Sequence, residues 1–285
     1  MAALKEVRQR IKAVKGIGQV TKAMKLVASV KLRRVQDKVV QIRPYTETLY
    51  EIATRLAAVR GDGEAAHPLL VEGPAGAEVV VVIGSDRGLC GSFNMALFRH
   101  VVAQLKGTNA NLVLVGRKAR EFFARQPFNV VKTYERLTFP MTWAEADQIG
   151  RDTVTLYTFM KLSRIRLAYQ RFLSPGVSKP SMIPWLPFTR AASAAPASAA
   201  DLRCEPSAEA VLDLVLPRAL IAQLQQALLE SQASEQGARM VAMDNATTNS
   251  SQLASDLNLL ANKLRQSGIT KELLEITTGA EALNN

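Results

Sequence analysis

The sequence has few of the residues that build disulfide frameworks and zinc centres. It contains two cysteines, Cys90 and Cys204, which lie far apart in the chain, and two histidines, His67 and His100. Such a set is too small for a disulfide-stapled scaffold or for a zinc site built from Cys and His. We therefore expect no metal site, and we interpret His67 as a bystander in a loop.

Long apolar runs are also missing. The longest run, Val79 to Ile83, is far shorter than the roughly 18 residues of a membrane span. The N-terminal segment MAALKEVRQR lacks the apolar core of a secretory signal. We expect a soluble, cytosolic chain that does not insert directly into a membrane, although it can lie at a membrane surface.

Acidic residues are outnumbered by basic ones, 25 to 36, which gives a net charge of +11. This excess predicts an acidic partner: nucleic acid, an anionic membrane or an acidic protein. Within the first forty residues, many residues are basic and only Glu6 and Asp37 are acidic. A solvated helix face, a collar against an acidic protein and a DNA-binding helix all fit this charge. The basic residues are Lys5, Arg8, Arg10, Lys12, Lys15, Lys22, Lys25, Lys31, Arg33, Arg34 and Lys38.

Proline is absent after Pro217, and apolar residues recur there at steps of three and four. This period predicts a helical stripe over residues 207–285, with Pro217 in the first turn. An unbroken helix of this length measures on the order of 100 Å at about 1.5 Å per residue. It either pairs with another long helix or projects into a partner.

One polar passage, Asp244 to Ser251, opposes the helix prediction. Short polar side chains compete for backbone hydrogen bonds, so two helices joined by a turn are an alternative. No glycine or proline interrupts the passage. We therefore favour a continuous helix.

The N-terminal segment, 1–60, predicts a second long helix. Apolar residues from Leu4 to Val59 follow a pattern close to a heptad seam. Gly16 and Gly18 weaken it, and Pro44 predicts a kink or a turn boundary. Two amphipathic helices at opposite ends of the chain indicate an antiparallel coiled coil, with the tip of the longer C-terminal helix protruding past the N-terminus.

The middle segment, 77–190, alternates apolar runs with helical patterns. This order predicts an inserted α/β domain with a small, open, Rossmann-like sheet. A low-complexity linker, 191–206, follows. The expected strands are 78–84, 111–115, 128–132, 164–172 and, more weakly, 183–188, and the expected helices are 95–106, 118–126 and 143–160.

The loop SDRGLCGSFN after the first strand is the most site-like stretch. Its glycines, with Gly84 before them, match neither dinucleotide-binding nor P-loop spacing, and no histidine lies nearby to activate Cys90. We therefore expect no cofactor and no catalytic residue. Gly88 and Gly91 fit a structural loop that turns tightly.

This loop, together with IKAVKGIGQVTKAMKLVASVKLRR and ASEQGARMVAMDNATTNSSQLASDLNLLANKLRQSGITKELLEI, resembles the gamma subunit of F-type ATP synthases. The resemblance implies a non-catalytic rotor shaft that couples proton transport to ATP synthesis or hydrolysis. It also implies a continuous C-terminal helix inside a ring of alpha and beta subunits. The α/β domain then forms a foot near the epsilon subunit and the c-ring, on the cytoplasmic face of the bacterial plasma membrane. The cysteine-bearing insert of the plant-type form is absent.

The resemblance also implies roles for individual residues. Met24 and Lys25 fall in a collar that faces an acidic loop of the beta subunit. Glu205 falls where the foot meets the c-ring and epsilon, although Cys204 replaces the usual aromatic residue before it. Further beta-subunit contacts are Arg265, Gln266, Thr270 and Glu272, and the apolar bearing around the tip comprises Leu273, Leu274 and Ile276.

A basic coiled-coil protein that binds nucleic acid is the alternative function. Such a protein loses affinity steeply as salt rises and needs no protein ring. The inserted α/β domain and the apolar C-terminal tip favour the rotor.

Overall fold

The computed structural model describes residues 2–60, 67–74, 78–108, 110–189 and 204–283, and the side chains of residues 2, 3, 59, 60, 272 and 279–283 fall outside the description. The chain forms two compact units. One comprises Met1–Ala28 with Met240–Asn285, and the other comprises Ser29–Arg239. Each long helix contributes to both units.

Helices α1 (Ala2–Arg60) and α5 (Ala208–Leu283) are the two long helices expected at the ends of the chain. The polar passage of α5 is helical, which confirms the continuous helix. Its hydroxyl groups remain within the helix: Thr247 and Ser250 donate to the carbonyl oxygens four residues earlier, at 2.7 Å each. Side chains that compete for backbone acceptors thus do so here without breaking the helix.

The structure corrects the place predicted for Pro217 and excludes one of the two alternatives for Pro44. Pro217 lies inside α5, which begins nearer to Ser207, whose Oγ accepts from the backbone N–H of Ala210 at 3.2 Å. Pro44 lies inside α1, so it is not a turn boundary, and the kink stays a prediction. A proline in a helix removes the bond to the carbonyl four residues earlier. Those carbonyls belong to exposed residues, Val40 and Asp213, where water can replace the lost partner.

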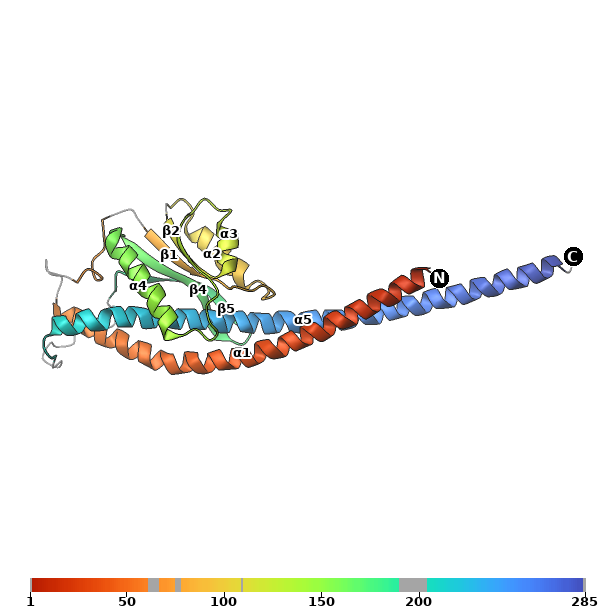
Figure 1. The fold of residues 1–285 in the computed structure, drawn as a ribbon, viewed down its shortest axis with the longest axis horizontal. Coiled ribbons are helices and arrows are strands. Elements are labelled where there is room, and N and C mark those ends of the chain that lie inside the picture. The colour runs from red at the N-terminus through yellow and green to blue at the C-terminus, as the bar shows by residue number, and fades with distance from the viewer. Residues whose placement is uncertain (1, 61–66, 75–77, 109, 190–203, 284–285) are drawn as a thin grey trace. The chain divides into compact units, whose positions relative to one another are not determined.

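The sheet has the order β3-β2-β1-β4-β5 (Figure 1). Strand β1 pairs in parallel with β2 and β4, β2 pairs in parallel with β3, and β5 is antiparallel to β4. Every residue of β1 is buried, as its run of valines indicates. The strands are β1 (Glu78–Ile83), β2 (Ala110–Val115), β3 (Asn129–Tyr134), β4 (Arg164–Ser174) and β5 (Val177–Leu186).

The sheet lies between two layers of helix. On one face, α2 (Phe93–Gln104) and α3 (Arg117–Phe123) bury an aromatic and aliphatic core. On the other face, α5 packs with α4 (Trp143–Phe159), where a Cβ on Gly150 would lie 2.8 Å from Ile221 (Figure 1). The α5 segment that faces the sheet therefore occupies the layer that a crossover helix fills in other α/β folds.

Candidate functional site

Met24 and Lys25 of the predicted basic collar lie in the unit built from Met1–Ala28 and Met240–Asn285. The two helices run antiparallel there: Thr21 Oγ1 lies 2.8 Å from Thr247 Oγ1, and Lys25 Nζ lies 2.7 Å from Asp244 Oδ1. At Gly18, a Cβ would lie 3.4 Å from Ser250 Cβ, so small residues allow close packing. The expected antiparallel pairing is therefore present in this unit.

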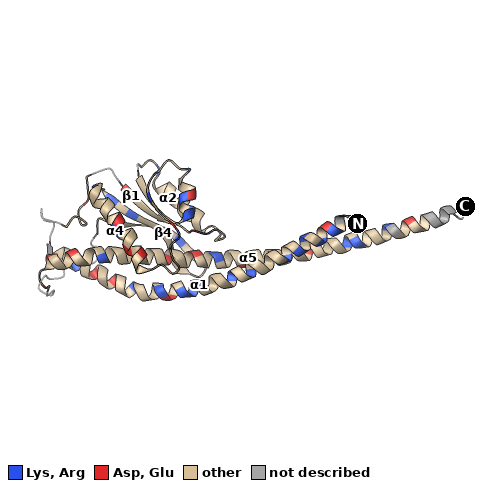
Figure 2. Ribbon diagram, viewed as in Figure 1, with Lys and Arg blue, Asp and Glu red and all other residues tan. Residues whose placement is uncertain are grey.

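The ion pair of the collar is exposed and weak. Lys25 and Asp244 keep 39% and 53% of their side-chain surface exposed, so their ion pair contributes only about 0–1 kcal/mol. Met24 beside them is half-buried. Lys15 and Lys22 join Lys25 along a groove of about 780 Å³. Figure 2 shows lysine and arginine recurring along α1.

The end of α5 is exposed. Among the described side chains after Ala254, none is buried. The three residues expected to form the bearing are more than half exposed: Leu273 at 57%, Leu274 at 60% and Ile276 at 68%. Burying such a side chain stabilises a protein by about 1.5–3 kcal/mol, so this stripe favours a partner that covers it.

The polar residues predicted to contact a partner lie along the same stretch of α5. Arg265, Gln266 and Thr270 are exposed, and Thr270 donates its hydroxyl to the carbonyl of Gln266 at 3.0 Å. The side chain of Glu272 lies outside the described residues. Glu205 is in the other unit, where it is exposed just before α5 and follows a half-buried Cys204.

In the loop after β1, Gly88 is half-buried and Gly91 has a positive φ of 58°. Asn94 holds the loop by accepting from the Ser85 N–H at 3.1 Å and donating to Ser85 Oγ at 2.8 Å. Asp86 accepts from the N–H of Arg117 at 2.9 Å. An internal carboxylate thus occupies the place at α3 where a phosphate would approach.

Cys90 in this loop is not an activated nucleophile. It is only 3% exposed, and Asn94 Nδ2 lies 3.3 Å from its Sγ. Burial raises the pKa of the Cys90 thiol, and the nearby Arg239 opposes that effect only in part. A reactive cysteine needs a lowered pKa and access to solvent, and Cys90 has neither.

Sequence reasoning gave no role to the polar residues on the buried face of α5. Arg239 donates to the carbonyl oxygens of Arg87 and Gly88 and pairs with Glu235 at 2.6 Å. Ser231 Oγ donates to the carbonyl of Ile83 at 3.2 Å. The available signal was the polar run SEQGAR inside an otherwise apolar stripe.

Two further properties concern only the residues that the structure describes. None of these helices is long and apolar enough to cross a membrane. The described side chains also contain no cluster of three or more His, Cys, Asp or Glu that could hold a metal ion.

Comparisons with known proteins decide the family. A family model described as ATP synthase matches residues 3–283. The ATP synthase gamma chain of Heliobacterium modesticaldum is 39% identical over 291 residues, covering 99% of this chain and 100% of that protein. That of Anaeromyxobacter dehalogenans is 40% identical over 290 residues, with the same coverage. The chain belongs to the ATP synthase gamma chain family.

Solved structures share the fold of this gamma chain. The structure described as OSCP/F1/c-ring of Euglena gracilis mitochondrial ATP synthase matches with a TM-score of 0.71 and 20% identity, covering 99% of this chain and 95% of that one. A central stalk/c-ring structure from Tetrahymena thermophila matches with a TM-score of 0.62 and 22% identity, covering 80% and 99%. The family assignment confirms the resemblance seen in the sequence, and no finding favours nucleic-acid binding.

Proposed function

We propose that this gamma chain is the central rotor shaft of a proton-translocating ATP synthase. It transmits torque between a proton-driven c-ring and a ring of catalytic alpha and beta subunits, and it has no active site of its own. The observation that carries the proposal is the exposed end of α5, where apolar side chains stand in solvent. A stripe of this kind is stable in a cell when other subunits surround it.

The beta-subunit contacts are proposed at two places along the shaft. Met24 and Lys25 face an acidic loop at the collar, while Arg265, Gln266, Thr270 and Glu272 make polar contacts farther along α5. Exposed ion pairs worth about 0–1 kcal/mol can form and break at each step of rotation. Leu273, Leu274 and Ile276 then form a bearing, because apolar packing has no preferred direction.

The foot is the second half of the proposal. Glu205 lies in the same unit as the sheet, and its exposed carboxylate is available to the epsilon subunit or the c-ring. The same-fold structures are described as a central stalk with c-ring and as an F1/c-ring assembly. We place the chain at the cytoplasmic face of the bacterial plasma membrane, as a peripheral subunit.

The described loop after β1 supports the proposal that the isolated chain is not catalytic. Its Asp86 accepts from the backbone N–H of Arg117 at the start of α3, and its one cysteine is buried with a raised pKa. Neither group is available to bind a phosphate or to attack one.

Reconstitution tests the proposal. The purified chain is mixed with alpha and beta subunits of the same organism, and assembly and ATP hydrolysis are measured with Mg²⁺. We expect a stable complex that hydrolyses ATP, and no turnover by the chain alone. Leu273→Asp with Leu274→Asp should weaken assembly, whereas Leu214→Asp, at an equally exposed leucine in the other unit, should not. Hydrolysis by the chain alone that persists through repeated purification contradicts the proposal.

A further inference from the structure

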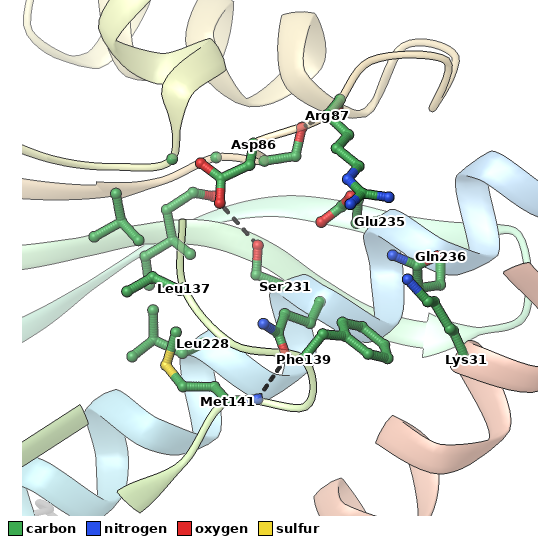
Figure 3. Close-up of a pocket in the computed structure, with 16 residues that line it drawn as sticks. Lys31, Asp86, Arg87, Leu137, Phe139, Met141, Leu228, Ser231, Glu235 and Gln236 are labelled. Atoms are coloured by element: carbon green, nitrogen blue, oxygen red, sulfur yellow. Dashed lines mark hydrogen bonds between the residues drawn. The ribbon is translucent and has the colours of Figure 1, made fainter. Parts of the chain in front are cut away.

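A cavity of about 140 Å³ lies at the carboxyl ends of β1 and β2 in the unit Ser29–Arg239. The loop after β1 and the segment around Phe139 form its walls, α5 forms its floor, and Lys31 of α1 closes one side (Figure 3). The carboxyl edge of a parallel sheet is where α/β folds bind their ligands. The proposed rotor function makes no use of this cavity.

The lining is divided by chemistry. Figure 3 shows Lys31, Arg87 and Gln236 on one side of the cavity, and Leu137, Leu228 and Met141 on the other. A site with an apolar wall and a few polar groups at one end is typical of small-molecule pockets.

Two hydrogen-bond donors at the polar end have no protein acceptor among the described residues. Gln236 is only 5% exposed, lines the cavity and makes no hydrogen bond with a described side chain or backbone group. Lys31 forms no ion pair within the described part of the chain. Its Nζ instead lies 5.0 Å from the centre of the Phe139 ring. The Gln236 amide is therefore free to donate to a molecule in the cavity.

The acidic groups of the cavity are already committed. Glu235 Oε1 pairs with Arg239 at 2.6 Å, and Asp86 Oδ1 accepts from the Arg117 N–H at 2.9 Å. Burial raises the pKa of Glu235 and the positive charge of Lys31 opposes that rise, but the two side chains form no ion pair. The groups that remain available are therefore the cations Lys31 and Arg87 and the Gln236 amide, which together suit an anion.

The volume limits the size of that anion. Pockets for drug-sized ligands measure about 300–1,000 Å³, so a nucleotide does not fit. An apolar protein cavity of about 150 Å³ accommodates benzene. A single ring or a short chain with one anionic group matches the space.

We propose that this cavity binds a small organic carboxylate, with the carboxylate held by Lys31 and Gln236 and the apolar body against Leu137, Met141 and Leu228. A bound molecule joins α1, the segment after β3 and α5 at one point. It therefore stabilises the folded unit by mass action.

Benzoate is the probe, and the full-length chain labelled with ¹³C at its methionine methyl groups is the sample. The Met141 methyl resonance is followed during titration, and thermal unfolding is recorded in parallel. Benzamide has the same shape without the charge and serves as the matched ligand. Lys31→Gln removes the proposed contact, and Lys38→Gln is the matched control on an exposed site of the same helix.

We expect a saturable shift of the Met141 resonance and a raised unfolding temperature with benzoate. Lys31→Gln should weaken binding about tenfold or more, because a hydrogen bond to a charged group carries at least that factor, while Lys38→Gln binds normally. No saturable shift up to about 50 mM, where even a weak ligand of this size binds, overturns the proposal. So does benzamide binding as tightly as benzoate, a result that needs no variant to fold.

Discussion

Arg239 of α5 binds the loop after β1 through its backbone, with the guanidinium Nη2 3.1 Å from the carbonyl oxygen of Gly88. The same Nη2 lies 2.6 Å from Oε1 of Glu235, one turn earlier on α5. Both side chains are largely buried, at 9% and 14% exposed. One arginine therefore neutralises a buried acid and fixes the α/β domain to the helix.

Replacing Arg239 with methionine should lower the free energy of unfolding by about 3–5 kcal/mol at neutral pH, because it leaves Glu235 buried and unpaired. Burial raises the pKa of Glu235. A raised acid pKa means that the folded state binds the proton more tightly, so the loss should shrink as pH falls toward the unfolded value and grow as pH rises. Chemical denaturation of the full chain at several pH values measures this.

Two further variants make that experiment decisive. Adding Glu235→Gln to Arg239→Met should recover part of the stability, since the buried charge is then gone. Arg10→Met, in an exposed pair with Glu6, should change stability by less than about 0.5 kcal/mol. Equal losses in the single and double variants would show that the pair is not what holds the loop.

Thr142 and Glu145 form a capping box at the start of α4. Partial burial raises the pKa of Glu145, but hydrogen bonds from Thr138 and Thr142 outweigh it and lower the pKa to about 2. A depressed acid pKa contributes stability above the unfolded value of 4.5, and this is lost as pH falls toward 2. Glu145→Gln should therefore flatten the pH dependence of unfolding in that window.

The threonine of the box supplies the matched test for α4. Thr142→Ala should cost about 1 kcal/mol at neutral pH, the usual loss when an N-cap is removed. Thr155→Ala, an exposed threonine on the same helix that bonds only to the Arg151 carbonyl, should cost little. Denaturant titrations of both variants compare them, and equal losses would argue against the cap.

The two cysteines should differ in reactivity and should not pair. Burial raises the pKa of Cys90, so little thiolate forms there, whereas Cys204 is half-buried. Brief alkylation of the native protein near pH 8 should modify Cys204 alone, and denaturation should expose both. Loss of both thiols together after mild oxidation, measured by mass spectrometry, would contradict this expectation.

Periodicity was sufficient to predict the two long helices and the alternation of strands and helices along the chain, but not the order of the strands in the sheet. A helix predicted from its apolar spacing continues through a polar passage when the polar side chains bond to the backbone of the same helix, as Thr247 and Ser250 do. Propensity alone misplaced Pro217 in the first turn of α5; this proline sits inside the helix, where exposed backbone tolerates a lost bond. It also shortened β5, which begins at Val177 after a hairpin turn through Gly176 at a φ of 87°.

Contacts between segments that are far apart in the chain could not be predicted from the sequence. Lys31 and Gln236 are separated by more than two hundred residues, and nothing in either local pattern places them at one cavity. Glu235 and Arg239 are spaced as a helical pair, yet the loop that they hold is known only from the fold. The contacts proposed for Met24 and Arg265 depend on subunits outside this chain and stay predictions.

A substitution at Met24 tests the rotor proposal most directly. Met24 is half-buried beside Lys25, whose pair with Asp244 is too exposed to contribute more than about 1 kcal/mol. Met24→Lys adds a charge at an apolar position. A new pair there with an acidic loop can reach a few kcal/mol if partly desolvated, because the effective dielectric falls below that of water. The shaft must overcome that energy each time it passes.

The most direct measurement is ATP hydrolysis beside proton pumping in membrane vesicles that carry each variant. We predict that Met24→Lys assembles and hydrolyses ATP but pumps fewer protons per ATP, while Met24→Leu, the uncharged control, couples normally. Lys25→Ala should also stay near normal, since it removes only one weak contact. Normal coupling in Met24→Lys together with uncoupling in Lys25→Ala would mean that fixed ion pairs drive the collar, which contradicts a shaft held by weak and exchangeable contacts.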